Sequence, residues 1–158
     1  MLKVVGIDPG LANTGIGLIQ GNGLTITKYS FGNIKTDKKD PICLRLNIIY
    51  TKIKGFLYEQ KPDIVVIEDI FSLGKYPITS ITLGKVSGVL ILAAFKAGAK
   101  VNEIPVRQAK KIVSGSGTAD KYQVEKTIRN ILNHPEKIKP FHASDALALA
   151  LCEYYRSS

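Results

Sequence analysis

The chain begins with three predicted β-strands joined by short turns, whereas every later strand follows a helix. The first three strands cover residues 2–8, 15–20 and 24–34. The "GNG" turn (21–23) between the last two is a strong hairpin signal. Two more strands, 63–68 and 99–105, each come after a helical segment. Because strands separated by helices are typically parallel neighbours, this order predicts an α/β fold with a mixed sheet and helices on its faces.

The spacing of apolar residues predicts five helices. They cover residues 41–60, 78–98, 106–113, 118–132 and 142–156. We expect Asp40 to cap the first helix, with Pro41 at its first position, and Thr118 to cap the fourth. The second helix is apolar around much of its circumference. The sequence has no repeat, low-complexity tract or linker, so residues 1–158 are expected to form one domain.

Basic residues outnumber acidic ones, which gives the chain a formal net charge of +9. Such a charge favours a polyanionic partner. No uninterrupted apolar run approaches the roughly 20 residues needed to span a bilayer, and the first residues enter a strand with no signal segment before it. Cys43 and Cys152 do not have the spacing of metal ligands. We therefore expect a cytoplasmic protein with no membrane partner.

Acidic side chains stand at the ends of two apolar strands. Asp8 ends the first strand and Glu68 the fourth, and in open α/β sheets the carboxyl ends of the strands form the edge where ligands bind. His142 and Asp145 lie three residues apart, on one face of the last helix. Oxygen ligands that converge without an arginine or lysine in the same motifs are what Mg²⁺ or Mn²⁺ requires. We therefore expect these four side chains to form one metal site.

Simpler interpretations of the same residues remain open. An aspartate before Pro-Gly, such as Asp8, is a common turn former. Asp69 lies beside Glu68, so one of these two acids is expected to be plain surface. His142 with Asp145 could be a capping pair at the start of a helix. The joint pattern favours a site, because both strand ends and the helical pair are predicted at one edge of one sheet.

Four segments, in this order and spacing, resemble the RuvC Holliday-junction resolvases over nearly the full chain. They are "GIDPGLANTGIGLI", "VVIEDIFSLGK", "RQAKKIVSGSGTADKYQV" and "ASDALALAL". Sugar kinases and Hsp70-like ATPases open with a strand similar to "GIDPG", but this chain is too short for their duplicated ATPase and lacks the P-loop lysine and hydroxyl. The resemblance implies a ribonuclease H-like fold, with a five-stranded mixed sheet in the order 3-2-1-4-5 and helices on both faces.

The resemblance also implies an activity and its residues. Asp8, Glu68 and Asp145 match the catalytic acids of the family, and His142 stands where many members carry aspartate and some carry histidine. The family hydrolyses one phosphodiester in each of two opposed strands, which leaves 5′-phosphate and 3′-hydroxyl ends, in DNA recombination and repair. Two divalent ions about 3.5–4 Å apart fit this chemistry. Asp8 is expected to bridge both ions, Glu68 to hold one, and Asp145 with His142 the other. A neutral imidazole favours Mn²⁺ over Mg²⁺ relative to a carboxylate, so the preferred ion stays open.

Other residues are expected to bind DNA. Lys110 and Lys121 match basic positions that lie near the scissile phosphate in the family, and further candidates are Lys75, Arg107 and Lys111. Phe71 matches a residue that inserts near the crossover, so we expect it to stack on bases. The lysines could instead be solvated surface residues, and Phe71 could fold back onto the core.

The apolar helix 78–98 is expected to form a homodimer by packing against its own copy. A two-fold dimer would suit the symmetry of a four-way junction; the alternative is that this helix is deeply buried in one subunit. A partnership with the RuvA–RuvB branch-migration complex rests on the resemblance alone. Two other functions stay open: a catalytically silent ribonuclease H-like DNA-binding module, and a nuclease for another branched or RNA-containing substrate.

Overall fold

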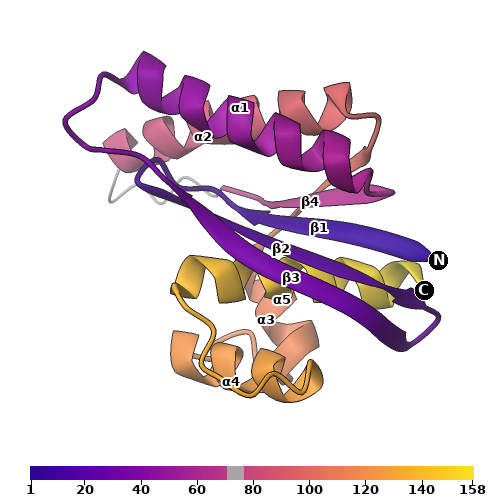
Figure 1. Cartoon of the computed structure of the whole chain (residues 1–158). Helices are drawn as coiled ribbons and strands as arrows, with labels where there is room; N and C mark the ends of the chain where they lie inside the picture. Colours follow the sequence, from indigo (N-terminus) through magenta and orange to yellow (C-terminus); the bar gives the residue numbers. More distant parts are fainter. Residues whose placement is uncertain (71–76) are drawn as a thin grey trace.

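The computed structural model describes residues 1–70 and 77–158. The strands in this part of the chain are β1 (Leu2–Asp8), β2 (Asn13–Asn22), β3 (Thr25–Lys35), β4 (Ile64–Glu68) and β5 (Lys100–Ile104). They form one sheet in the order β3-β2-β1-β4-β5 (Figure 1). β2 is antiparallel to both β1 and β3, while β4 is parallel to both β1 and β5. The predicted mixed sheet and its strand order are confirmed.

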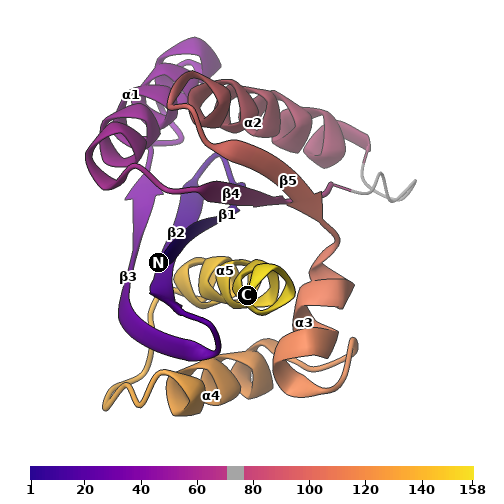
Figure 2. The same ribbon diagram turned by 90° about the vertical axis from the view of Figure 1, so that its right-hand side faces the viewer.

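Helices cover both faces of this sheet, as the sequence predicts. They are α1 (Ile42–Gln60), α2 (Pro77–Lys96), α3 (Val106–Ser114), α4 (Lys121–Ile131) and α5 (Phe141–Ser157). α1 and α2 lie on one face, and α5 lies on the other (Figures 1 and 2). α3 and α4 pack on α5 from outside, so α5 is the central element of its layer.

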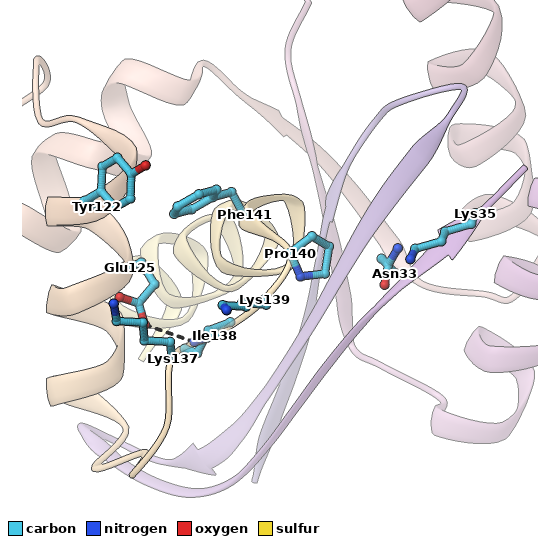
Figure 3. A pocket seen from close by; sticks show the side chains of 9 residues that line it. All are labelled: Asn33, Lys35, Tyr122, Glu125, Lys137, Ile138, Lys139, Pro140 and Phe141. Carbon is cyan, nitrogen blue, oxygen red and sulfur yellow. Dashed lines mark hydrogen bonds between the residues drawn. The ribbon is translucent and has the colours of Figure 1, made fainter. Parts of the chain in front are cut away.

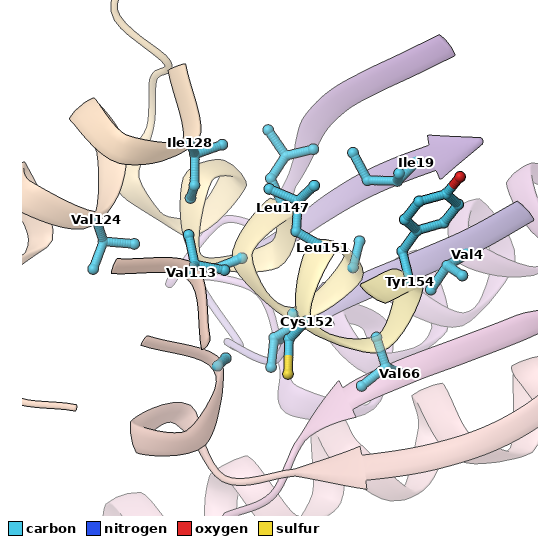
Figure 4. Close-up of a cluster of buried hydrophobic side chains, with 14 of the residues drawn as sticks. Val4, Ile19, Val66, Val113, Val124, Ile128, Leu147, Leu151, Cys152 and Tyr154 are labelled. Atoms are coloured by element: carbon cyan, nitrogen blue, oxygen red, sulfur yellow. The ribbon is translucent and has the colours of Figure 1, made fainter. Parts of the chain in front are cut away.

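The alternation of side chains along β1 and β4 divides the interior into two cores. Val4 and Val66 point into the core under α5, whereas Val5 and Val65 point into the core under α1 and α2. Figure 4 shows Val4 and Val66 beside side chains of α5. Because side chains on a strand alternate between faces, the even-numbered positions of both strands face α5. Asp8 and Glu68 are even-numbered, which places both acids on the side of the sheet that α5 covers.

Glycines in β1 and β2 let α5 lie directly against the sheet. A Cβ on Gly6 would collide with backbone atoms of Ala146 and Ala150, and a Cβ on Gly15 would collide with the backbone of His142. Glycine is used where two backbones approach this closely. The first turn of α5, which carries His142, therefore sits against the strands at the end where β1 finishes.

Two predicted helix caps are wrong. Pro41 has an extended backbone (ψ 148°) and is itself the residue before α1, so Asp40 lies one position too far out to reach the free amides of the first turn. α4 is capped by Asp120, whose carboxylate accepts hydrogen bonds from the N–H groups of Tyr122 and Gln123, while the Gln123 side chain accepts one from the Asp120 N–H. This capping box ends the preceding loop two residues later than predicted.

α2 is the one helix in the described part of the chain that is long and apolar enough to cross a membrane by length and composition, with a mean hydropathy of 1.8. A single such helix is weak evidence of a membrane span, because core helices of globular proteins pass the same test. One side of α2 is buried against α1 and the sheet, through Val86, Leu90, Ala93 and Ala94. Its other side is exposed and apolar.

Candidate active site

The carboxylates at the ends of β1 and β4 lie next to each other. The two strands are parallel, with Ile7 beside Ile67, so Asp8 and Glu68 follow in neighbouring positions. Both side chains face α5, and hydrogen bonding between them links the pair. Asp8 is 6% exposed, which is rare for an aspartate unless other groups compensate its charge. The strand ends therefore build a partly buried pair of acids, as the sequence predicts.

The first turn of α5 adds an imidazole and a third carboxyl group. His142 Nδ1 lies 2.6 Å from Asp8 Oδ2. Asp145 follows one turn later and is close enough to Asp8 and Glu68 to affect proton binding at this edge. The structure thus brings together Asp8, Glu68, His142 and Asp145, although 134 residues separate His142 from Asp8 in the sequence.

The acids raise one another's affinity for protons. Burial, followed by the hydrogen bond and charge of Asp8, raises the pKa of Glu68 to about 9. Burial and the charge of Asp8 raise the pKa of Asp145 to about 6. The hydrogen bond to Asp8 raises the pKa of His142, against an opposing effect of burial. The site therefore holds more negative charge than its own residues neutralise when every carboxyl group is ionised.

A divalent cation fits this donor set by charge and by chemistry. Carboxylate oxygens and an imidazole nitrogen are usual ligands for Mg²⁺ and Mn²⁺. A cation would oppose the burial and the charge repulsion that together raise the pKa values of Glu68 and Asp145. Within residues 1–70 and 77–158, no three His, Cys, Asp or Glu side chains lie in positions that could hold a metal ion as they stand, so these four would have to move closer together around a cation. His142 Nδ1 cannot bind a cation while it donates a proton to Asp8, so a metal would use Nε2 or displace that proton.

Two of the predicted DNA-binding lysines lie close to the acids. The positive charge of Lys110, on α3, partly offsets the rise in the pKa of Glu68 and of Asp145. Lys121, at the start of α4, partly offsets the rise in the pKa of Asp145. Arg107 and Lys111 are exposed on α3, and neither influences these acids. The positions predicted for base stacking and a further phosphate contact, Phe71 and Lys75, lie outside the described residues.

Two aromatic residues beside the site were missed by the sequence analysis. Lys121 Nζ lies 4.8 Å from the ring centroid of Phe141 and 5.5 Å from that of Tyr122. The two rings contact each other edge to face, with centroids 5.1 Å apart. Each aromatic directly adjoins a predicted site residue in the sequence, since Tyr122 follows Lys121 and Phe141 precedes His142. This adjacency in the sequence was the signal that could have pointed to the two aromatic residues.

Comparison with known proteins identifies the family. The family described as "Crossover junction endodeoxyribonuclease RuvC" matches residues 4–153. The protein of that name from Caldicellulosiruptor saccharolyticus is 36% identical over 99% of this chain and 95% of its own, and the one from Syntrophomonas wolfei is 38% identical over 98% and 89%. A structure described as "T. thermophilus RuvC in complex with Holliday junction substrate" superposes with a TM-score of 0.88, at 28% identity over 99% of this chain and 95% of that one. The chain therefore belongs to the RuvC family of crossover junction endodeoxyribonucleases.

Proposed function

We propose that this protein is a structure-selective endonuclease that resolves four-way (Holliday) DNA junctions by paired, symmetric cuts, in homologous recombination and DNA repair. The observation that carries the proposal is that Asp8, Glu68, His142 and Asp145 lie near one another at one edge of the sheet, in a chain of the RuvC family. The Thermus relative, with a structure described as a complex with Holliday junction substrate, supports the same substrate here.

The proposed roles of the acids follow from their positions. Asp8 lies between Glu68 and His142, so its two oxygens are the ones best placed to be shared between neighbouring cations. Glu68 would hold one ion, and Asp145 with His142 the other. Two bound Mg²⁺ or Mn²⁺ ions would lower the pKa of a water molecule and neutralise the leaving oxygen. Glu68, whose pKa is raised to about 9 without a cation, would release its proton when metal binds.

Lys110 and Lys121 are proposed to bind the phosphates beside the cut. Each is close enough to affect the acids electrostatically, and so is close enough to attract a phosphate that enters the same site. Lys75, Arg107 and Lys111 are proposed to bind phosphates further along the DNA. Phe71 is proposed to stack on bases.

We also propose a homodimer built on α2. Its outward side carries a stripe with spacings of three and four residues, made of Ile78, Ile81, Lys85, Gly88, Leu92 and Phe95, all of them exposed. Such a stripe is the usual contact surface between helices. A Cβ on Gly88 would meet no atom within 4 Å in the described part of the chain, so the space above it is open to a second helix. A C2 dimer would present two active sites to the two strands of one junction.

Three broader statements complete the proposal. Residues 1–158 act as one nuclease domain, since a single sheet borders both cores. The protein works in the cytoplasm, where bacterial DNA lies. The RuvA–RuvB branch-migration complex delivers the junction to it. The last of these is supported by family membership alone.

The test is cleavage of a synthetic four-way junction beside a linear duplex of the same sequence, with Mg²⁺ and with Mn²⁺. We expect paired symmetric nicks in the junction only, with 5′-phosphate and 3′-hydroxyl ends. Asp8→Asn should reduce the cleavage rate by about a thousandfold or more while binding is kept or strengthened, because it removes a ligand and a negative charge. Asp37→Asn, at an exposed acid of a loop, is the matched control.

The other candidate functions predict different results. A silent DNA-binding module would bind the junction without cutting it under either metal. A nuclease with another branched or RNA-containing substrate would cut that substrate in preference to the junction. Equal cutting of the linear duplex, or undiminished cutting by Asp8→Asn, would contradict the proposal.

A further inference from the structure

A cavity of about 780 Å³ opens beside the candidate active site, between the end of β3, the start of α4 and the loop that leads into α5. Figure 3 shows Tyr122 and Phe141 on one side of it, Lys35 on the opposite side, and Lys137 and Lys139 along the loop between them. We call this cavity the lysine–aromatic pocket. Its volume is within the range of about 300–1,000 Å³ that is usual for binding sites of small organic groups.

The charge of the lysine–aromatic pocket favours an anion. Lys35, Lys137 and Lys139 are exposed, and none of them forms an ion pair with an acid in the described part of the chain. The one acid in the lining, Glu125, is 6% exposed. Its Oε1 accepts hydrogen bonds from Arg129 Nε (3.1 Å) and from the Ile138 N–H (3.0 Å), so its charge is compensated. Three uncompensated ammonium groups therefore surround the cavity.

Glu125 also joins two elements of the pocket lining. Its bond to the Ile138 N–H ties the loop to α4, so that the flanking lysines stand on either side of a buried residue. Figure 3 shows this contact at the base of the cavity. Phe141 lines the pocket and directly precedes His142 in the sequence. Because the Cα atoms of adjacent residues are about 3.8 Å apart, the pocket borders the candidate active site.

Lys121 connects the pocket to the acids. Its ammonium group lies over both aromatic rings and also influences Asp145. A DNA strand whose phosphate is held at the acids by Lys121 would continue past Phe141 and Tyr122 into the lysine–aromatic pocket. Aromatic rings next to lysines are the usual platform for an unstacked base and its phosphates.

We propose that the lysine–aromatic pocket binds an unstacked nucleotide of the cleaved strand, a few nucleotides from the cut, with its base against Tyr122 and Phe141 and its flanking phosphates held by Lys137 and Lys139. This inference rests on the proposed function, because it assumes DNA at the neighbouring acids. The pocket thereby fixes the path of the strand as it leaves the active site, and its effect is a preference for substrates that can release a base from the stack.

The first test is the salt dependence of junction binding, measured by fluorescence anisotropy without divalent metal so that no cleavage occurs. Lys137→Gln with Lys139→Gln should flatten the slope of log affinity against log salt by about 1.4, at roughly 0.7 per lost single-strand phosphate contact. The matched control, Lys28→Gln with Lys52→Gln, removes the same charge from exposed positions outside the pocket and should change the slope much less.

The second test moves a single abasic site along the cleaved strand. The wild-type protein should lose about tenfold in affinity when the abasic site occupies one position near the cut, because a stacked base is lost there. Tyr122→Leu should bind the intact junction about tenfold more weakly. Its affinity should no longer fall when the abasic site occupies that position. Tyr122 is 65% exposed, so this variant is expected to fold normally.

The results separate the pocket from the function as a whole. Equal salt slopes for the pocket and control pairs, or an abasic profile that Tyr122→Leu leaves unchanged, would overturn the pocket while junction cleavage stands. A wild-type protein with no preference for the junction over linear duplex would overturn the proposed function itself.

Discussion

His142 Nδ1 contacts Asp8 Oδ2 at 2.6 Å, and this contact joins the first turn of α5 to the end of the central strand. The glycine at position 15 makes the approach possible, because a side chain there would collide with the His142 backbone. The contact satisfies a buried carboxylate that would otherwise cost several kcal/mol. When metal binds at Asp8, this contact would have to break, or the cation would have to replace the proton shared by the two side chains.

We expect the metal-free protein to lose stability as the pH rises. The pKa of Asp145 is raised from 3.8 to about 6 and that of Glu68 from 4.5 to about 9, so between these limits the folded state binds more protons than the unfolded state. The free energy of unfolding therefore falls with rising pH across that range. The raised pKa of His142 acts in the same direction.

Chemical denaturation from about pH 5 to about pH 8.5, with and without about 10 mM Mg²⁺, would measure this effect. Glu68→Gln should flatten the pH dependence, and Glu103→Gln, at an exposed strand position, should not. Added metal should restore stability most at the high-pH end. A stability that rises with pH in the metal-free wild type would contradict the electrostatics described above.

Replacing the imidazole in the site should change the metal preference. His142→Asp supplies a hard oxygen ligand in place of a nitrogen, so the ratio of cleavage rates in Mg²⁺ and Mn²⁺ should shift toward Mg²⁺ by about tenfold. The matched control is His134→Asn, because His134 Nδ1 contacts the Tyr29 hydroxyl and not the acids. An unchanged ratio in His142→Asp would mean that His142 is no metal ligand.

Adjacent lysines on α3 should behave differently. Lys110 lowers the pKa of Glu68 and Asp145, so Lys110→Gln should move the rising limb of the pH–rate profile to higher pH as well as weaken junction binding. Lys111→Gln loses the same charge from the next residue and should weaken binding only slightly, with no shift of the profile. If the two variants give the same profile, Lys110 is an ordinary surface lysine.

A charge on the exposed side of α2 should dissociate the proposed dimer. Phe95 is 73% exposed in the single chain, so Phe95→Glu should leave the fold intact yet raise the dimer dissociation constant by about thirtyfold or more. Leu24→Glu, at a 77% exposed position in the β2–β3 hairpin, is the control and should leave the dimer unchanged. Sedimentation over a dilution series distinguishes them, and a wild type that is monomeric throughout would rule out the dimer.

The α/β class and the candidate acids could be predicted from the amino-acid sequence. Asp8 and Glu68 each end an apolar strand, and strands separated by helices are typically parallel neighbours. These are local consequences of residue type and order, which a single sequence carries, whereas the strand order that sets β1 beside β4 came from the resemblance to the RuvC family. The cap of α4 is also local, and it was mispredicted because Thr118 and Asp120 both have capping side chains and only the loop conformation chooses between them.

How the distant parts of the chain meet could not be predicted in this way. The contact of His142 with Asp8, the effect of Lys110 on Glu68 and Asp145, and the lysine–aromatic pocket each join segments far apart in the sequence. The sequence does not fix these distances, because they depend on how closely α5 approaches the sheet and on how α3 and α4 pack around α5. Tyr122 lies in a predicted helix and Phe141 in the loop just before another, and only the packing brings their rings together and next to Lys121.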